Sequence, residues 1–317
     1  MHKIASFFVW HFILLLSFLP KWLFYGISNI LSFLMLHLFK YRADVIDVNL
    51  ARSFPSLDYW EYKEIKKKYY SHMVDLAVES IWWLTAKISS IQKIVRVKNP
   101  ELLDELCANH SKVVVLLGHF GNWELMSGMT VPLTYKEEGS YSKKKMYVSY
   151  KRANSKLWND IFCKMRMQSY KNVGNEGEII ESHRLLRHIL NRENEGIYMF
   201  IADQSPAAQR IVANFLNQPT LMFNGGEYVA RRLNLPVVYM SMKKVSRGVY
   251  DITYNLISLD SAKTEEGDIT RKFASLLEQD IIGCKEAWLW SHKRWKGRLT
   301  EQEKSEYLKL NKVTKIN

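Results

Sequence analysis

The sequence predicts an α/β protein, in which helices flank a mixed, mostly parallel central sheet and an N-terminal hydrophobic segment anchors the chain to a membrane. Three observations support this fold class. From residue 93 onward, short apolar runs alternate with helical patterns, as in sheets built from crossover connections. Several of these runs are continuously apolar and β-branched, which is typical of strands covered on both faces. Residues 4–39 are almost uniformly apolar.

The alternating region, residues 93–300, is expected to form one α/β domain with its functional groups at the carboxyl ends of the strands, where such sheets bind ligands. Strands are expected at residues 94–97, 113–117, 145–149, 196–201, 236–242 and 250–256. Helices are expected at residues 100–109, 122–129, 155–167, 176–191, 225–233 and 269–282. Residues 137–145 are expected to form a polar loop.

Residues 1–40 are expected to be the membrane anchor. Two apolar blocks, residues 4–19 and 22–39, flank Pro20-Lys21, and each approaches the roughly 20 residues that cross a hydrocarbon core. No small-residue cleavage site follows the first block, which argues against a secretory signal peptide. One span, a hairpin and an interfacial helix pair remain alternatives. Lys40 and Arg42, just beyond the blocks, favour a cytoplasmic location for the rest of the chain.

Residues 41–92 are expected to be helical, and residues 301–317 to form a polar C-terminal tail. Asp58 is a suitable N-cap for the charged segment that follows it.

The composition narrows the class of protein. The chain has 317 residues, 47% of them hydrophobic, and a net charge of +13, so it is not a disordered protein and favours acidic partners. Its 10 Trp and 17 Tyr suit a bilayer interface, where both residue types concentrate. The three cysteines have no paired spacing, which indicates neither a disulfide framework nor a zinc site.

The most informative motif is Gly-His-Phe-Gly-Asn-Trp-Glu, residues 118–124, which follows the expected strand 113–117. Residues five apart on one helix face away from each other, so His119 is expected in the turn and Glu124 in the helix after it. Asn122 is expected to cap that helix, whose free N–H groups would hold an oxyanion or phosphate near His119. A carboxylate beside His119 would fix its tautomer and make it a better general base. A core histidine and a carboxylate at a helix start are the alternative.

Five further segments carry candidate site residues. Lys151 and Arg152 follow an expected strand and would bind a phosphate or carboxylate, with an ordinary basic loop as the alternative. Asp203 follows the strand 196–201 and would orient Arg152 or His119 or bind a hydroxyl; an Asx turn is the alternative. Arg166, in an expected helix, is a weaker candidate for binding an anion.

Gly225 and Gly226 open an expected helix, where backbone N–H groups would receive a phosphate, although a loop-to-helix hinge is equally consistent with the pair. The segment 288–296, Trp-Leu-Trp-Ser-His-Lys-Arg-Trp-Lys, mixes three tryptophans with His292, Arg294 and other basic residues. This interleaving suits a surface beside anionic lipid, and no nucleic-acid-binding signature accompanies it.

These motifs, in this order, resemble the lipid A biosynthesis late acyltransferase family, the lauroyl and myristoyl acyltransferases of the lysophospholipid acyltransferase-like superfamily. The resemblance extends from about Lys21 to Arg298. It rests on the Gly-His-x4-Glu box, on the Ala-Asp-Gln turn at residues 202–204 and on the closing Trp-x-Trp-x-His-x-Arg-Trp-Lys. Weaker support comes from Tyr-Arg at 41–42, Asn-Leu at 49–50 and Phe-Pro at 54–55. The family's Tyr-Arg-x-x-Asn-like stretch corresponds to residues 150–154, where the basic residue is displaced to Lys151 or Arg152 and the usual proline is absent. The turn after Asp203 lacks the usual glycine.

The resemblance implies a glycerolipid acyltransferase-like fold and a membrane-associated O-acyltransferase. It implies that His119 and Glu124 form the catalytic dyad, with His119 as general base. It also implies substrate-binding roles for a basic residue at Lys151 or Arg152 and for Asp203, with Asn122, Gly225, Gly226, His292 and Arg294 as further candidates.

By the same resemblance, the donor is acyl carrier protein loaded with a fatty acyl thioester, and the acceptor is a hydroxyl of a lipid A precursor. No cofactor or metal is expected. The location implied is the bacterial inner membrane, with the catalytic domain facing the cytoplasm. The alternatives are acylation of another glycolipid, phospholipid or aminolipid, and a basic membrane protein that binds anionic lipid without catalysis.

Overall fold

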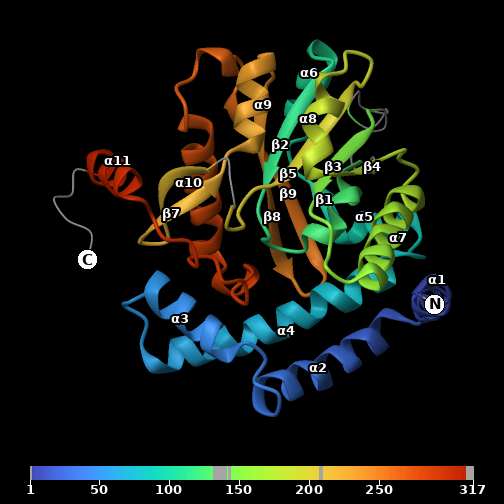
Figure 1. The fold of residues 1–317 in the computed structure, drawn as a ribbon. Coiled ribbons are helices and arrows are strands. Elements are labelled where there is room, and N and C mark those ends of the chain that lie inside the picture. Colours follow the sequence, from blue (N-terminus) through green and yellow to red (C-terminus); the bar gives the residue numbers. More distant parts are fainter. Residues whose placement is uncertain (1, 131–140, 142–143, 207–209, 312–317) are drawn as a thin grey trace.

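A seven-stranded sheet forms the centre of the protein in a computed structural model that describes residues 2–130, 141, 144–206 and 210–311. The strand order is β1-β9-β8-β2-β5-β3-β4 (Figure 1), and every neighbouring pair is parallel except β8 with β9. The expected mixed, mostly parallel sheet flanked by helices is therefore confirmed. The strands are β1 (Val95–Val97), β2 (Lys112–Leu117), β3 (Met146–Tyr150), β4 (Glu178–Glu181), β5 (Gly196–Ile201), β8 (Val237–Ser246) and β9 (Val249–Ser258).

Helices cover both faces of this sheet because alternate side chains of each strand point to opposite sides. Val114 and Leu116 of β2 belong to one buried cluster, whereas Val113, Val115 and Leu117 belong to another. The first face is covered by α8 (Ser182–Leu190), α9 (Gly225–Leu233) and α10 (Asp268–Gly283). The second is covered by α5 (Ile88–Ile94), α6 (Pro100–Asn109), the 3-10 helix η1 (Trp123–Thr130) and α7 (Lys156–Asn172).

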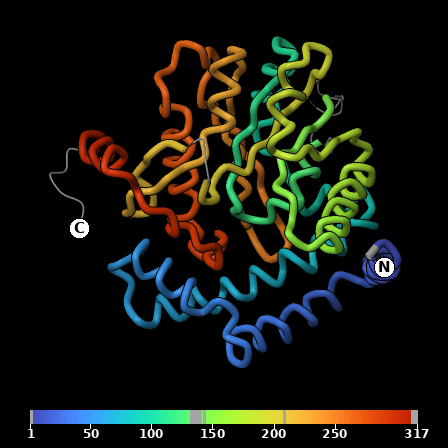
Figure 2. The backbone as a smooth tube through the Cα atoms, in the orientation of Figure 1, coloured from blue at the N-terminus to red at the C-terminus, as the bar shows by residue number. Residues whose placement is uncertain are grey.

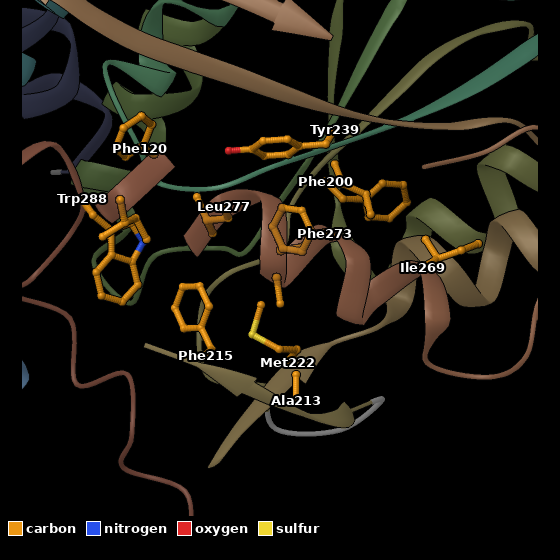
Figure 3. Close-up of a cluster of buried hydrophobic side chains, with 14 of the residues drawn as sticks. Phe120, Phe200, Ala213, Phe215, Met222, Tyr239, Ile269, Phe273, Leu277 and Trp288 are labelled. Carbon is orange, nitrogen blue, oxygen red and sulfur yellow. The ribbon is translucent and has the colours of Figure 1, made fainter. Parts of the chain in front are cut away.

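The cluster on the first face joins the sheet to the site loops. In Figure 3, Tyr239 and Phe200 of the sheet lie above Phe273 and Leu277 of α10, and Trp288 lies at one end of the cluster. All five are almost completely buried. Burying a side chain of this size contributes roughly 1.5–3 kcal/mol, so the segment that contains Trp288 is anchored by the core.

Four helices precede the sheet: α1 (His2–Leu16), α2 (Lys21–His37), α3 (Ala43–Ser53) and α4 (Tyr59–Trp83). They run along one side of the sheet in Figures 1 and 2, with α2 against α4 and α1 beside α7. Asp58 forms a capping box with Glu61 at the start of α4, as expected of an N-cap. His72 of α4 contacts the Gly121 carbonyl oxygen at 3.2 Å, which places α4 across the carboxyl end of β2.

No single helix in the described residues is long and apolar enough to cross a bilayer; Lys3–Leu16 and Lys21–His37 meet the length and composition requirement only as a pair, bent by 115°.

Several elements differ from the sequence-based expectation. An antiparallel hairpin, β6 (Arg210–Phe215) and β7 (Gln218–Phe223), was not expected. Its turn places Leu216 and Asn217 at φ values of 51° and 59° without the glycine that usually signals such a turn. The expected helix 176–191 begins as β4, and the helix expected at 122–129 is η1. Residues 301–311 of the expected tail form helix α11 (Glu301–Asn311). Most of the expected loop 137–145 lies outside the described residues.

Candidate active site

His119 lies just beyond the carboxyl end of β2, in the turn where the sequence predicted it. The turn depends on Gly121, which has a φ of 64°, and a Cβ atom there would lie 2.0 Å from the Met242 carbonyl oxygen. Gly121 also donates its N–H to the Ala287 carbonyl at 2.9 Å, and Phe120 pairs with Trp288 in a β-bridge. The C-terminal segment therefore fixes the loop that carries His119.

The hydrogen-bonding partner of the His119 ring is Asp203, at the end of β5. The imidazole Nδ1 lies 2.6 Å from Oδ1 of Asp203, and the backbone N–H of His119 donates to Oδ2 at 2.9 Å. The Trp288 indole N–H donates to the same Oδ2 at 2.8 Å. Because β2 and β5 are parallel neighbours, their carboxyl ends bring the histidine and the aspartate together.

Asp203 is held as a carboxylate. Its burial alone would raise its pKa, but the charge of His119 and the hydrogen bonds from His119 and Trp288 outweigh burial and lower that pKa to about 2. A carboxylate accepts and cannot donate, so His119 Nδ1 carries the proton that joins them. The side-chain nitrogen of Gln204 lies 3.1 Å from His119 Nε2. An amide nitrogen only donates, so Nε2 is the lone-pair nitrogen and points toward solvent-exposed Gln204.

Glu124 occupies a different arrangement from the one the motif suggested. Arg166 of α7 holds it in a bidentate ion pair, with Nε to Oε2 at 3.0 Å and Nη2 to Oε1 at 2.7 Å. The Trp123 indole N–H also donates to Glu124 at 3.2 Å. The tautomer-fixing contact expected of Glu124 is made by Asp203 instead, because the turn directs the Nδ1 side of the ring toward β5.

Glu124 nevertheless lies within electrostatic range of His119. Burial would raise the pKa of Glu124, but the charge and hydrogen bonds of Arg166, followed by the charge of His119, lower it. The Trp123 ring packs edge-on against the His119 ring, with centroids 4.9 Å apart. Glu124 is therefore an ionised second carboxylate close to His119. The sequence assigned Arg166 only a weak anion-binding role; in the structure its anion is Glu124.

Asn122 does not cap the helix after it. It is fully buried and its side chain donates to Glu79 of α4 at 2.7 Å, while no described residue contacts its Oδ1. Glu79 also accepts hydrogen bonds from Tyr25 and Tyr250, at 3.0 and 2.8 Å. Burial raises the pKa of Glu79, although these donors oppose the shift. The sequence gave no signal for Glu79, because it lies 43 residues before Asn122.

The remaining predicted site residues fall into two groups. Lys151 and Arg152 are exposed just beyond β3, at the same edge of the sheet as His119. Gly225 and Gly226 open α9 but are packed tightly: a Cβ atom on Gly225 would meet the Phe223 ring at 2.2 Å and one on Gly226 would meet Leu116 at 2.6 Å. The structure gives these glycines a role in helix packing, and phosphate binding there stays a prediction.

The C-terminal segment 288–296 packs against α3 and α4. Arg42 donates to the Ser291 carbonyl at 2.9 Å, and Asn49 donates to the carbonyls of Trp290 and His292. Burial, with the nearby charges of Arg294 and His119, lowers the pKa of His292 to about 4, so its ring is neutral at pH 7. The segment with Arg42 and Asn49 and the segment 288–296, nearly 250 residues apart in the sequence, therefore form one structural unit beside the site. In the described residues, no group of three or more His, Cys, Asp or Glu side chains is arranged to hold a metal ion.

A partly buried, aspartate-oriented histidine at the carboxyl edge of a parallel sheet, with a second carboxylate nearby, has the arrangement of a general base in an acyl-transfer enzyme. The family model described as bacterial lipid A biosynthesis acyltransferase matches residues 1–297 of the chain. The chain therefore belongs to this family, and the family resemblance seen in its motifs is confirmed. No curated protein matches the sequence.

Proposed function

We propose that this protein is a membrane-associated O-acyltransferase that moves a fatty acyl chain from acyl carrier protein to a hydroxyl of a lipid A precursor. The observation that supports it most is the line from Asp203 through His119 to Gln204, in which Nδ1 of the ring is fixed on a carboxylate and Nε2 is left with its lone pair. Membership of an acyltransferase family supports the transfer of an acyl group.

In the proposed reaction, His119 Nε2 takes the proton of the acceptor hydroxyl as its oxygen attacks the thioester carbonyl carbon. The new C–O bond forms, the carbonyl electrons move onto oxygen, and the tetrahedral intermediate then collapses. The C–S bond breaks, the leaving sulfur takes the proton from Nε2, and the products are an ester and a free thiol. Asp203 stabilises the imidazolium formed between these two proton transfers.

Glu124 and Gln204 have supporting roles in this proposal. The Glu124–Arg166 pair adds a fixed carboxylate that favours the imidazolium electrostatically. The Gln204 amide occupies the position of the incoming hydroxyl, so it moves to a neighbouring hydrogen bond when the acceptor enters. One proton moves, and His119 alone takes it and returns it, so this step requires no metal or other cofactor. Lys151 and Arg152, exposed at the same edge, are positioned to contact an acidic carrier protein or an anionic substrate.

Helices α1 and α2 support the proposed association with a bacterial inner membrane. Large apolar side chains project into solvent from both helices and from the turn between them: Phe8 and Leu15 of α1 are 67% and 69% exposed, Phe18 of the turn 71% and Trp22 of α2 73%. Monomeric soluble proteins rarely expose so large an apolar patch. Two apolar helices joined by a sharp bend also fit a pair that lies in the headgroup region of a bilayer.

The test is acyl transfer by the purified full chain in detergent, with acyl carrier protein thioesters and a lipid A precursor, followed by mass spectrometry of the lipid. The product should gain the mass of one fatty acid less one water. His119→Gln should lower the rate by at least a thousandfold while the melting temperature stays close to that of wild type. If wild type transfers no acyl chain from carrier-linked donors to any lipid A precursor, the proposal is wrong.

A further inference from the structure

Arg294 is a buried cation without a carboxylate partner in the described residues. Its side chain is 2% exposed, and no ion pair joins it to an acidic residue there. One guanidinium nitrogen, Nη2, donates to the Leu221 carbonyl at 2.7 Å and lies 2.7 Å from the Met222 sulfur. Its Nε has no hydrogen-bond partner. Burying an unpaired charge costs several kcal/mol, so a group this well buried is expected to meet an anion.

A cavity beside this side chain is large enough for one. It has a volume of about 520 Å³, within the range of ligand sites and far above the roughly 30 Å³ that one water occupies. Its lining residues are Arg52, Ser205, Asn217, Gln218, Pro219, Leu221, Arg294, Trp295, Gly297 and Leu299. Two of these lining residues are arginines and none of those described is acidic, so the cavity has a positive wall.

Arg52, the second arginine, adds positive charge at the rim of the cavity. Arg52 lies near the end of α3 and is exposed, and no described residue pairs with it. The amide side chains of Asn217 and Gln218, in the turn and at the start of β7, donate to Ser53 and Leu216 and make this wall polar. The guanidinium groups are the phosphate-binding groups of the cavity, because arginine presents two parallel N–H groups to phosphate oxygens.

The cavity is linked to His119 in two ways, through residues adjacent in the sequence and through an electrostatic interaction. Ser205, which lines it, directly follows Gln204, whose amide lies 3.1 Å from His119 Nε2. Arg294 is close enough to Asp203 for that carboxylate to act on its pKa, which burial lowers to about 10 even so. A substrate that reaches His119 with its reacting group therefore has a neighbouring pocket for an anionic group.

We propose that the cavity bounded by Arg294 and Arg52 binds a phosphate ester of one of the two substrates while the reacting group lies at His119. The inference deepens the proposed acyltransferase function, and that function supplies the substrates. Arg294 holds the phosphate from the buried wall and Arg52 closes over it at the rim. The Arg294 contact with Leu221 also ties the pocket to the β6–β7 hairpin.

The first experiment measures binding alone, so it does not depend on acyl transfer. The melting temperature of the full chain is recorded against inorganic phosphate, with chloride at matched ionic strength, for wild type, Arg52→Gln, Arg294→Lys and Arg192→Gln. Arg192 is exposed after α8, so its variant is the matched control. Wild type and the control should show the same saturable stabilisation. Arg52→Gln should need roughly ten times more phosphate and Arg294→Lys more still. Equal phosphate curves for all four proteins would overturn the proposal.

The second experiment distinguishes the two sources of the phosphate through steady-state kinetics. If the acceptor lipid supplies it, Arg52→Gln should raise the KM for acceptor roughly tenfold and leave the KM for donor within twofold. If the phosphodiester of the carrier's prosthetic group supplies it, the donor KM should rise instead. A fall in kcat with neither KM changed would refute phosphate binding and indicate a structural role. Should no acyl transfer occur at all, the phosphate titration still decides whether the site exists.

Discussion

The replacement Asp203→Asn separates the site seen in the structure from the dyad suggested by the motif. In wild type, interactions in the site lower the pKa of Asp203 from 3.8 to about 2, which corresponds to roughly 2–3 kcal/mol in favour of the carboxylate. Asparagine retains one carbonyl oxygen, which can still accept from Trp288 and from the backbone of His119. Its amide group then faces Nδ1 and donates, so the histidine proton moves to Nε2.

A ring protonated at Nε2 cannot take the acceptor's proton, so kcat/KM should fall by about 10³–10⁴-fold, the loss typical of a misplaced tautomer. The assay is initial-rate acyl transfer from a carrier thioester, with the melting temperature measured on the same samples. Asp251→Asn is the matched control, because Asp251 pairs with Arg96 on β1, on the far side of β8 from β2. If Asp203→Asn keeps kcat/KM within threefold of wild type and Glu124→Gln loses it, then Glu124 sets the tautomer and this reasoning is wrong.

Three further outcomes are expected. For Glu124 and Arg166, a double-mutant cycle to Gln should give a coupling energy of about 1–2 kcal/mol in urea unfolding; additive effects would mean that the pair is not formed. Glu79→Ala leaves two buried donors, on Asn122 and Tyr250, and the partly buried Tyr25 hydroxyl without their acceptor. It should lower the free energy of unfolding by about 2–4 kcal/mol, clearly more than Glu79→Gln; equal losses would contradict its role as acceptor. Burial lowers the pKa of His72 to about 3, so the unfolded chain binds more protons than the folded chain between pH 6.5 and 3. The free energy of unfolding therefore decreases as the pH is lowered through that window. His72→Gln should flatten the melting temperature between pH 7 and 5, and an unchanged slope would refute the assignment.

The sequence predicted the sheet well because its strands are buried on both faces and read as continuous apolar runs. The expected strand 196–201 coincides with β5, and the expected helix 100–109 coincides with α6. The hairpin β6–β7 was missed because its turn uses Leu216 and Asn217 in left-handed conformations without a glycine. The segment 176–191 has a helical pattern throughout, yet pairing with β3 extends its first residues into an edge strand.

The site was predicted in position but not in its pairing, because hydrogen-bond partners depend on strand order and sequence spacing does not reveal strand order. The sequence placed His119 and Asp203 each at the end of a buried strand. Only the pairing of β2 with β5 makes them neighbours, and it leaves Glu124 to an arginine on α7 that is more than forty residues away. Arg166 therefore had a partner that spacing arguments could not identify.

The loop that carries His119 is held from three directions, and this explains why its geometry depends on distant segments. From α4, His72 contacts the Gly121 carbonyl and Glu79 accepts from Asn122. From the C-terminal segment, Ala287 accepts from Gly121, and Trp288 pairs with Phe120. From β5, Asp203 accepts from the His119 backbone as well as facing its ring. A general base must be fixed closely to act efficiently, and here the apolar N-terminal helices pack on the same α4 that steadies the loop. The N-terminal helices and the Trp-Leu-Trp segment at residues 288–290 are thus parts of the frame around His119, and all of them lie within the residues 1–297 that the family model matches.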